Sequence, residues 1–286
     1  MIPELLAIGS AILLAIQITV SRKGLLTLTV TSGLMINLSV ATVTLWLFAI
    51  IFFPTQNIDS TAILFFVLGG AIGPFLGRLF LFDGLRRLGA ALASTINGIY
   101  PLFASLIAII FLGEKITLFI FLGTVSITLG VGIISWSKSG SQWKFRKVYL
   151  IIPILASLCF GFSDSIMKFG LGLMDFPILG AAVMSTTALA SLTLFLICKG
   201  ELSLPIREEG SIYLVISGLI TSFFVMAFFS ALSFGTVVIV SPLAGTAPLF
   251  VLLFSRLFLK GIEKVTLYLV IGAIVITFGS TLVAIG

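Results

Sequence analysis

Long apolar runs without a single charge constrain this chain more than any other feature. The segments 5–20, 118–136 and 267–286 contain no Asp, Glu, Lys or Arg. A helix that crosses the hydrocarbon core of a bilayer needs about 20 such residues. Closed barrels can also span a membrane, but their strands alternate apolar and polar residues, which these segments do not. The sequence therefore predicts an all-α integral membrane protein.

The composition supports this assignment and excludes other classes. Of 286 residues, 59% are hydrophobic and 9% are charged, an apolar share above that of soluble domains. The net charge of +6 does not indicate nucleic-acid binding, because the basic residues fall between apolar runs, where they orient helices. Cys159 and Cys198 lie in separate apolar runs, so we expect no metal site and no cofactor. The expected partners are the lipid bilayer and a small-molecule substrate, and the protein is expected to be a monomer.

Charges and clusters of Gly, Pro and Asn divide the sequence into ten expected spanning helices. Five of them form a first unit at 1–137, a basic linker follows at 138–147, and five more form a second unit at 148–286. The expected helices cover 3–21, 29–53, 61–82, 89–112, 116–136, 148–171, 176–198, 211–232, 236–259 and 266–285.

The two units resemble each other near their ends. Pro-Leu-Phe at 101–103 recurs at 248–250, an offset of 248 − 101 = 147. Glu-Lys-Ile-Thr at 114–117 recurs as Glu-Lys-Val-Thr at 263–266, an offset of 263 − 114 = 149. Recurrence of this kind indicates a tandem duplication. The second offset also relates Gly123 to Gly272 and Gly130 to Gly279.

An odd number of helices per unit makes the two units inverted with respect to the membrane. The charges agree: of 16 basic residues, only Lys115 and Lys168 lie near even-numbered loops, which leaves 16 − 2 = 14 near odd-numbered loops. An opposite charge bias in related units indicates inverted repeats. If the basic side is cytoplasmic, both termini are extracytoplasmic, and the expected location is the plasma membrane.

Several short motifs resemble a known transporter family. The stretch from Gly89 to Pro101, then 112–117 and 123–130, resembles the fourth and fifth helices of an EamA domain of the drug/metabolite transporter superfamily. The second unit is similar at fewer positions, and Gly261-Ile262 interrupts the usual Gly-Glu pair. The resemblance implies ten helices around a central cavity and transport of metabolites, amino acids, drugs or nucleotide sugars by alternating access. Nucleotide-sugar carriers of the family have cytosolic termini, which disagrees with the charges here.

Asp164 is the first candidate for a functional site, because an ionisable side chain inside a membrane is costly. Lys168 follows four residues later, so the two side chains could form a structural ion pair near the helix end. Alternatively, Asp164 is a cavity charge for an ammonium group or a proton. Arg78 and Asp83, followed by Arg86 and Arg87, are interpreted as an interfacial cluster, with a gate as the alternative.

Asn97 is expected near the bilayer midplane, about 12 Å into its helix at 1.5 Å per residue. Ser94 and Tyr100 lie three positions away on either side, so the three share one helix face. The amide either lines a substrate cavity or bonds a neighbouring helix. Substrate contacts are expected at this face together with Gln17, Asp164, Ser241 and Thr246.

Function classes can be weighed on these grounds. The chain has no histidine, which excludes Ser-His hydrolases and HExxH metalloproteases. We therefore expect no enzyme, and favour a secondary transporter that moves a small amphipathic metabolite, such as an amino acid. A flippase for lipid-linked substrates is the main alternative. An intramembrane aspartyl enzyme using Asp83 and Asp164, or a receptor, is less favoured.

Overall fold

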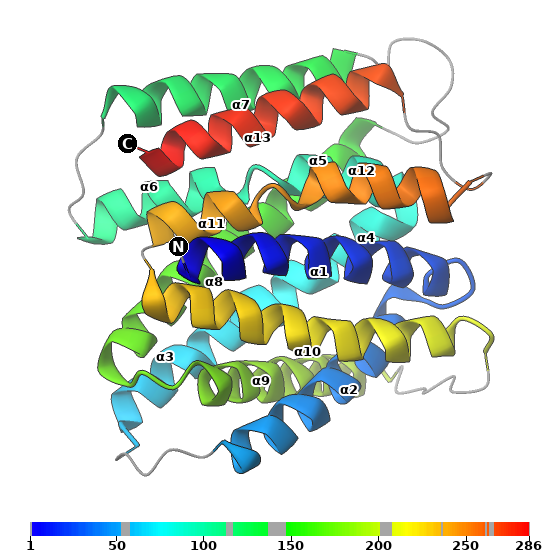
Figure 1. Cartoon of the computed structure of the whole chain (residues 1–286). Helices are drawn as coiled ribbons and strands as arrows, with labels where there is room; N and C mark the ends of the chain where they lie inside the picture. Colours follow the sequence, from blue (N-terminus) through cyan, green and yellow to red (C-terminus); the bar gives the residue numbers. More distant parts are fainter. Residues whose placement is uncertain are drawn as a thin grey trace.

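The computed structural model describes residues 2–52, 58–112, 117–136, 147–200, 208–235, 237–260, 262 and 266–285. Within these residues there is no β-strand, and helices account for nearly all of the chain (Figure 1). The elements are α1 (Ile2–Gly24), α2 (Val30–Ile51), α3 (Ser60–Gly70), the π-helix η1 (Ala71–Gly77), α4 (Arg78–Leu88), α5 (Ala90–Asn97), α6 (Tyr100–Leu112), α7 (Leu118–Trp136), the 3-10 helix η3 (Lys147–Leu150), α8 (Ile151–Leu173), α9 (Pro177–Lys199), α10 (Ser211–Phe234), α11 (Val237–Ala244), α12 (Ala247–Phe258) and α13 (Leu267–Ile285).

Six stretches of the described chain are long and apolar enough to cross a membrane. They are α1, α2, the continuous unit α3–η1–α4, η3–α8, α9 and α10. Shorter apolar helices cover Ala90–Ala104, Ala247–Phe258 and Leu267–Gly279. The protein is therefore an all-α, multi-pass membrane protein, as predicted, while the count of ten spans remains a prediction.

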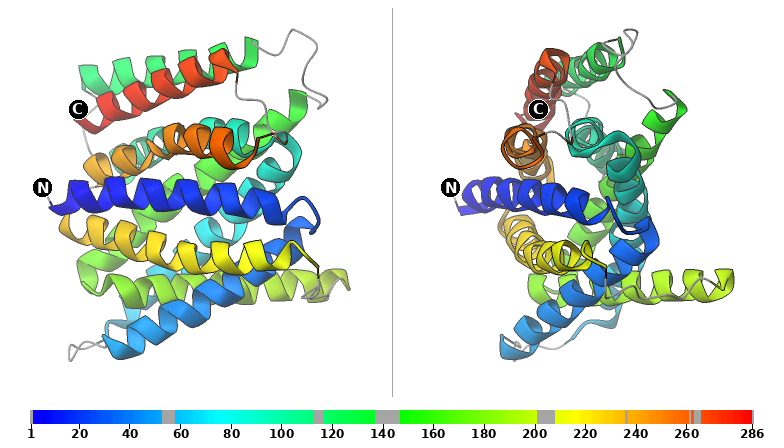
Figure 2. Two further views of the ribbon diagram at one scale, coloured as in Figure 1. Left: turned by 45° about the vertical axis from the view of Figure 1, so that its right-hand side comes forward. Right: turned by 90° about the vertical axis from the view of Figure 1, so that its right-hand side faces the viewer.

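The helices run nearly side by side and in alternating directions, and both chain ends lie at the same end of the bundle (Figure 1). α1 starts at this end, whereas α8, the first helix of the second unit, finishes there. The two units therefore traverse the bundle in opposite senses, as the inverted-repeat prediction requires. α7 and α13 form an antiparallel pair at one edge, and they stay together in the turned views (Figure 2).

The two repeats are interleaved. α1 packs against α10 and α12 of the second repeat, and α8 packs against α3, η1 and α6 of the first. α2 likewise packs against α10, and α9 packs against α3 and η1, while the pairs α2 with α9 and α7 with α13 join equivalent helices. Exchanging the two repeats therefore reproduces the same set of contacts, which is the pattern of a pseudo-twofold axis.

Local sequence signals fix several helix ends. Thr29 accepts a hydrogen bond from the Ser32 amide at the start of α2, at 3.2 Å. Asp59 caps α3, where the amides of Ala62 and Thr61 donate to its carboxylate and lower its pKa. Such caps satisfy amides that have no partner inside the helix. Gly89, with φ of +86°, separates α4 from α5, because few other residues adopt that backbone conformation.

Two of the expected helices are broken, which corrects the prediction of continuous helices at 89–112 and 236–259. The first break lies between α5 and α6 at residues 98–99, and the second lies between α11 and α12 at residues 245–246. Pro101 and Pro248 stand in the first turns of the new helices, where a missing amide costs nothing. The two breaks meet, since a Cβ added to Gly98 would lie 2.9 Å from Cγ of Pro248.

The third expected helix, 61–82, is longer than predicted and continues to Leu88. Pro74 lies inside it, within the π-helical segment η1. A proline removes an amide donor and clashes with the preceding turn, and a π-helical turn is one way to accommodate the missing bond. Because the helix continues, Arg78 lies 88 − 78 = 10 residues from its end, which is about 15 Å at 1.5 Å per residue.

The repeated glycines lie at the contact between α7 and α13. A Cβ added to Gly279 would lie 2.7 Å from the Gly123 carbonyl oxygen and 2.8 Å from the Ile127 nitrogen. A Cβ added to Gly130 would lie 3.0 Å from the Gly272 carbonyl oxygen. Small residues allow helix backbones in membranes to approach this closely. Gly123 therefore faces Gly279 and Gly130 faces Gly272, so each repeated glycine meets the non-equivalent glycine of the other repeat, as an antiparallel pair requires.

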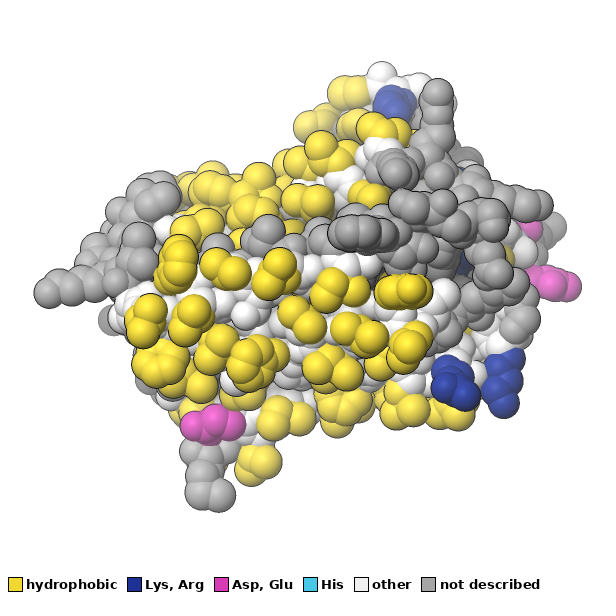
Figure 3. Space-filling view, turned by 90° about the horizontal axis from the view of Figure 1, so that it is seen from above, with side chains coloured by type: hydrophobic (Ala, Val, Ile, Leu, Met, Phe, Trp, Pro, Cys, Tyr) yellow, Lys and Arg dark blue, Asp and Glu magenta, His cyan; other side chains and the backbone are white. Residues whose placement is uncertain are grey.

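The side of the molecule that carries α7 and α13 presents mainly apolar side chains (Figure 3). The Lys and Arg side chains visible on this side gather toward one end. An apolar outer surface of this kind suits contact with lipid, where no hydrophobic penalty attaches to exposed Leu, Ile and Phe.

Candidate functional site

A central cavity lies between the two repeats. Its wall includes Leu14 of α1, Leu81 of α4 and Tyr100 of α6 from the first repeat, and Phe160 of α8 and Phe228 of α10 from the second. Its volume is about 90 Å³, where a single water needs about 10–15 Å³ by the same kind of measure. This conformation therefore has room for a few waters or a small chemical group.

Asp164 lies on the cavity wall and links the repeats. One of its carboxylate oxygens, Oδ2, accepts a hydrogen bond from Ser241 Oγ at 3.3 Å. The backbone carbonyl of Ser241 in turn accepts a hydrogen bond from the Tyr100 hydroxyl at 2.6 Å. Asp164 forms no ion pair with any described residue, so its carboxyl group faces the cavity with one hydroxyl partner.

Asn97 combines the two roles considered for it. Ser157 Oγ of α8 lies 3.2 Å from the Asn97 carbonyl oxygen and 3.4 Å from its Oδ1, so the residue contacts a neighbouring helix, although the single hydroxyl proton of Ser157 has a nearer acceptor in the Pro153 carbonyl oxygen at 2.8 Å. Asn97 also lines the cavity, and no described residue accepts a hydrogen bond from its Nδ2. The amide donor is thus available to a ligand.

Gln17 lines the cavity and also belongs to a buried polar network that connects three helices. Gln17 Nε2 donates to Ser21 Oγ at 2.8 Å and to Ser217 Oγ at 3.3 Å. The Asn37 amide nitrogen donates to the same Ser217 Oγ at 2.8 Å and to Thr221 Oγ1 at 3.2 Å. This network joins α1 and α2 of the first repeat to α10 of the second.

Arg78 extends the network into the cavity. It is 9% exposed and lines the wall, and its Nη1 donates to Asn37 Oδ1 at 3.2 Å. The sequence interpretation of Arg78 as part of an interfacial cluster is therefore wrong. The error follows from the expected end of the third helix, because the six additional residues place Arg78 deep inside the bundle.

Ser94, Ser241 and Thr246 do not belong to the cavity wall. The Ser94 hydroxyl donates to the Ala91 carbonyl of its own helix, and the Thr246 hydroxyl, in the break between α11 and α12, donates to the Leu243 carbonyl at the end of α11. Ser241 reaches the cavity only through Asp164. The helix break after Asn97 removes the regular spacing on which the shared face of Ser94, Asn97 and Tyr100 was predicted.

The predicted ion pair between Asp164 and Lys168 is also wrong. Lys168 Nζ donates instead to the carbonyl oxygens of Leu232 and Gly235, at 2.6 and 2.8 Å. Both carbonyls lie at the C-terminal end of α10, where the last carbonyls of a helix lack partners and a cation is favourable. Lys168 therefore ties α8 to the end of α10.

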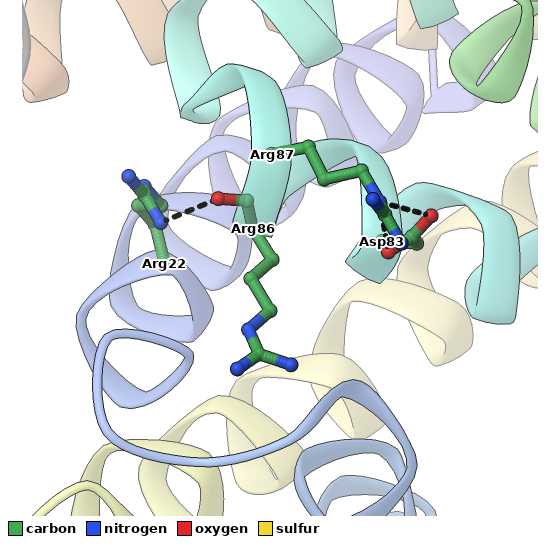
Figure 4. A network of polar contacts seen from close by, with 4 residues as sticks. All are labelled: Arg22, Asp83, Arg86 and Arg87. Carbon is green, nitrogen blue, oxygen red and sulfur yellow. Dashed lines mark hydrogen bonds and ion pairs between the residues drawn. The ribbon is translucent and has the colours of Figure 1, made fainter. Parts of the chain in front are cut away.

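The other basic residues of the third span, Arg86 and Arg87, do form a polar cluster with Arg22 and Asp83 near the end of α4, while its position at the membrane surface stays a prediction (Figure 4). Arg87 Nε lies 2.7 Å from Asp83 Oδ1, and its guanidinium lies 4.8 Å from the centre of the Tyr149 ring. Arg22 Nη1 donates to the Arg86 carbonyl oxygen at 3.3 Å, which ties α1 to α4.

The sequence assigns Arg78 to an interfacial cluster or a gate, and it does not predict the contacts that Asn37 and Ser217 make behind the cavity wall. An arginine ten residues before a helix end is a strong signal for function in a membrane, but only when the helix end is known. Asn37 and Ser217 lie 180 residues apart, and polar residues so distant carry no sign of their contact in one sequence.

The fold and the cavity define a class: an integral membrane protein of two inverted repeats with a mainly apolar cavity between them that contains a few polar groups, the architecture of secondary transporters. A family model described as the EamA-like transporter family matches residues 1–136 and 147–285. The chain belongs to this family, within the drug/metabolite transporter superfamily, and is therefore a membrane transporter.

Solved structures are similar in fold. One of them, titled "Crystal structure of protein", has a TM-score of 0.69 at 14% sequence identity, and the match covers 98% of this chain and 95% of that one. At that identity the likeness shows a shared fold. A search of curated proteins found no match.

Proposed function

We propose that this protein is a secondary transporter that moves a small amphipathic metabolite, such as an amino acid, by alternating access. The observation that carries this proposal is the cavity between the repeats, which combines an aromatic wall with a few polar groups, Asp164, Asn97 and Gln17 among them. Ligand sites are mostly apolar with few placed polar groups. The small volume of the cavity favours a metabolite over a large drug.

Inverted repeats supply the physical basis for alternating access. Two pseudo-equivalent halves can exchange conformations, so that the same site opens first to one side and then to the other. The breaks after Asn97 and before Ala247 lie in equivalent helices and meet at the centre, where changes in backbone angle would alter both halves together.

We also propose that the basic end of the bundle is cytoplasmic. The helices α1, α4, α9 and α12 all end on the side away from both termini (Figure 1). Their last turns carry Lys and Arg, and such residues are retained on the cytoplasmic side. The basic residues are Arg22, Lys23, Arg86, Arg87, Lys199 and Arg256.

Counterflow into proteoliposomes tests the function. Purified protein is reconstituted with a panel of unlabelled metabolites inside, and uptake of each labelled compound is measured. Asn97→Ala should weaken transport of the accepted compound by a few-fold, the loss of one hydrogen bond worth about 1 kcal/mol. Ser126→Ala is the matched control, because Ser126 bonds only the Leu122 carbonyl of its own helix. Equal kinetics for Asn97→Ala and wild type would reject the site, and movement of lipid-linked compounds alone would favour a flippase.

A further inference from the structure

Arg78 lies at the junction between η1 and α4, where the π-helical turn with Pro74 ends. It is about 15 Å from the helix end at 1.5 Å per residue, which places it near the middle of a core about 30 Å thick. A buried arginine at this depth is expensive and marks a functional position in a membrane protein. The role that the proposed transport gives to Asp164, Asn97 and Gln17 leaves this cation unexplained.

The guanidinium is held in place but is not neutralised. It carries five N–H donors, and its one hydrogen bond to a described residue is the 3.2 Å bond from Nη1 to Asn37 Oδ1. No carboxylate among the described residues lies within ion-pair distance of it. Asp164 lines the same cavity without pairing to it.

The orientation of Asn37 is set by its neighbours. Both bonds of its amide nitrogen go to hydroxyl groups of α10, those of Ser217 and Thr221. Its Oδ1 is therefore turned toward Arg78, and Asn37 is fully buried. Because Ser217 is tied in turn to Ser21 at 2.6 Å, the support of the arginine extends across both repeats. This one oriented bond directs the guanidinium and leaves its other donors for a ligand.

A planar guanidinium with free donors matches the geometry of a carboxylate, to which it binds through two parallel N–H···O bonds. Phe82, Phe160 and Phe228 also line the wall and would contact an apolar tail.

We propose that Arg78, positioned by Asn37, is a binding site for the carboxylate of the transported metabolite, so that the substrates of this protein are small carboxylates with an apolar tail. This inference rests on the proposed function in that it uses the same cavity. Binding of the carboxylate would supply the counter-charge that the described part of the chain does not provide for Arg78.

The test uses three probes of one shape. L-leucine carries both a carboxylate and an ammonium group, L-leucinamide lacks the carboxylate, and 4-methylpentanoate lacks the ammonium group. Binding to the purified full chain is measured by thermal shift and calorimetry, for wild type, Arg78→Met, Arg78→Lys and the control Arg86→Met. Arg86 is an exposed arginine of the same helix.

Wild type should bind L-leucine and 4-methylpentanoate at least about tenfold more tightly than L-leucinamide, as expected for a lost charge-assisted pair. Arg78→Met should lose this preference, Arg78→Lys should retain part of it, and Arg86→Met should resemble wild type. Asn37→Ala should weaken carboxylate binding in the presence of Arg78. Because Arg78 has only one protein bond, the ligand-free melting temperature of Arg78→Met should stay close to that of wild type.

Three outcomes would overturn the proposal: L-leucinamide binds as well as L-leucine, no carboxylate probe binds wild type, or Arg78→Met keeps the preference for carboxylates. A structural role for Arg78 would be assigned by a different pair of results. Arg78→Met would then show a large fall in its ligand-free melting temperature, and Arg78→Lys would have normal stability and keep the carboxylate preference at wild-type strength. A failure of the proposed transport function can be told apart from a failure of this proposal. In the first case counterflow is absent while carboxylate binding still depends on Arg78.

Discussion

The contact between α7 and α13 permits a quantitative prediction from a single methyl group. Gly279→Ala places a Cβ 2.7 Å from the Gly123 carbonyl oxygen and 2.8 Å from the Ile127 nitrogen. Both are backbone atoms, so neither can rotate away, and the two helices must separate locally. Forcing one extra carbon into a packed contact costs about 1–3 kcal/mol. Alanine also favours a helix over glycine by up to about 1 kcal/mol, which partly offsets this cost.

Gly9→Ala is the control that separates the two effects. Gly9 lies inside α1, and a Cβ added there meets no atom within 4 Å, so this variant gains only the helix preference. The difference between the variants isolates the packing cost of about 1–3 kcal/mol, or about 2–12 °C at roughly 2–4 °C per kcal/mol. Thermal unfolding in detergent, followed by tryptophan fluorescence, measures it. Equal melting temperatures for Gly279→Ala and Gly9→Ala would show that α7 and α13 do not approach this closely.

Two further predictions concern charge. Lys168→Met should lower the free energy of unfolding by about 1.5–3 kcal/mol for each charged hydrogen bond lost. The effects of Asp164→Asn and Lys168→Met should add within about 0.5 kcal/mol in the double variant. A measured coupling of about 1 kcal/mol or more would instead support an ion pair between Asp164 and Lys168. In a variant without Cys159 and Cys198, Ile58→Cys should react with an impermeant maleimide on intact cells, whereas Leu26→Cys should react only after permeabilisation. The reverse labelling pattern would invert the proposed orientation.

The membrane class and the two-repeat organisation could be predicted because they depend on signals that act along the chain. Uncharged runs report burial in lipid, and the spacing of Pro101 and Pro248 reports duplication. The helix breaks at residues 98–99 and 245–246 could not be predicted in this way, because a proline that follows a helix break and a proline that kinks a continuous helix give the same sequence pattern. The end of the third helix was misplaced because Arg78 and Asp83 looked like residues of a membrane surface.

The site could be predicted only where polar residues stand out against an apolar helix. Asp164, Asn97, Tyr100 and Gln17 were found in this way, and all four line the cavity. The choice of partners could not be predicted, because Lys168 lies one turn from Asp164 and yet bonds carbonyls of α10. Sequence spacing describes one helix, whereas those partners depend on which helix lies beside it.

The interleaving of the repeats has a consequence for how the chain is made. α1 leaves the ribosome first, yet its packing partners α10 and α12 belong to the last third of the sequence. The hydrogen bond from Gln17 to Ser217, 200 residues later in the chain, cannot form until α10 has been made. Contacts of such sequence separation form slowly. Until α10 is inserted, the Gln17 amide lacks its Ser217 partner. Although α1 is synthesised long before α10 and α12, its packing is therefore completed only when they are in place.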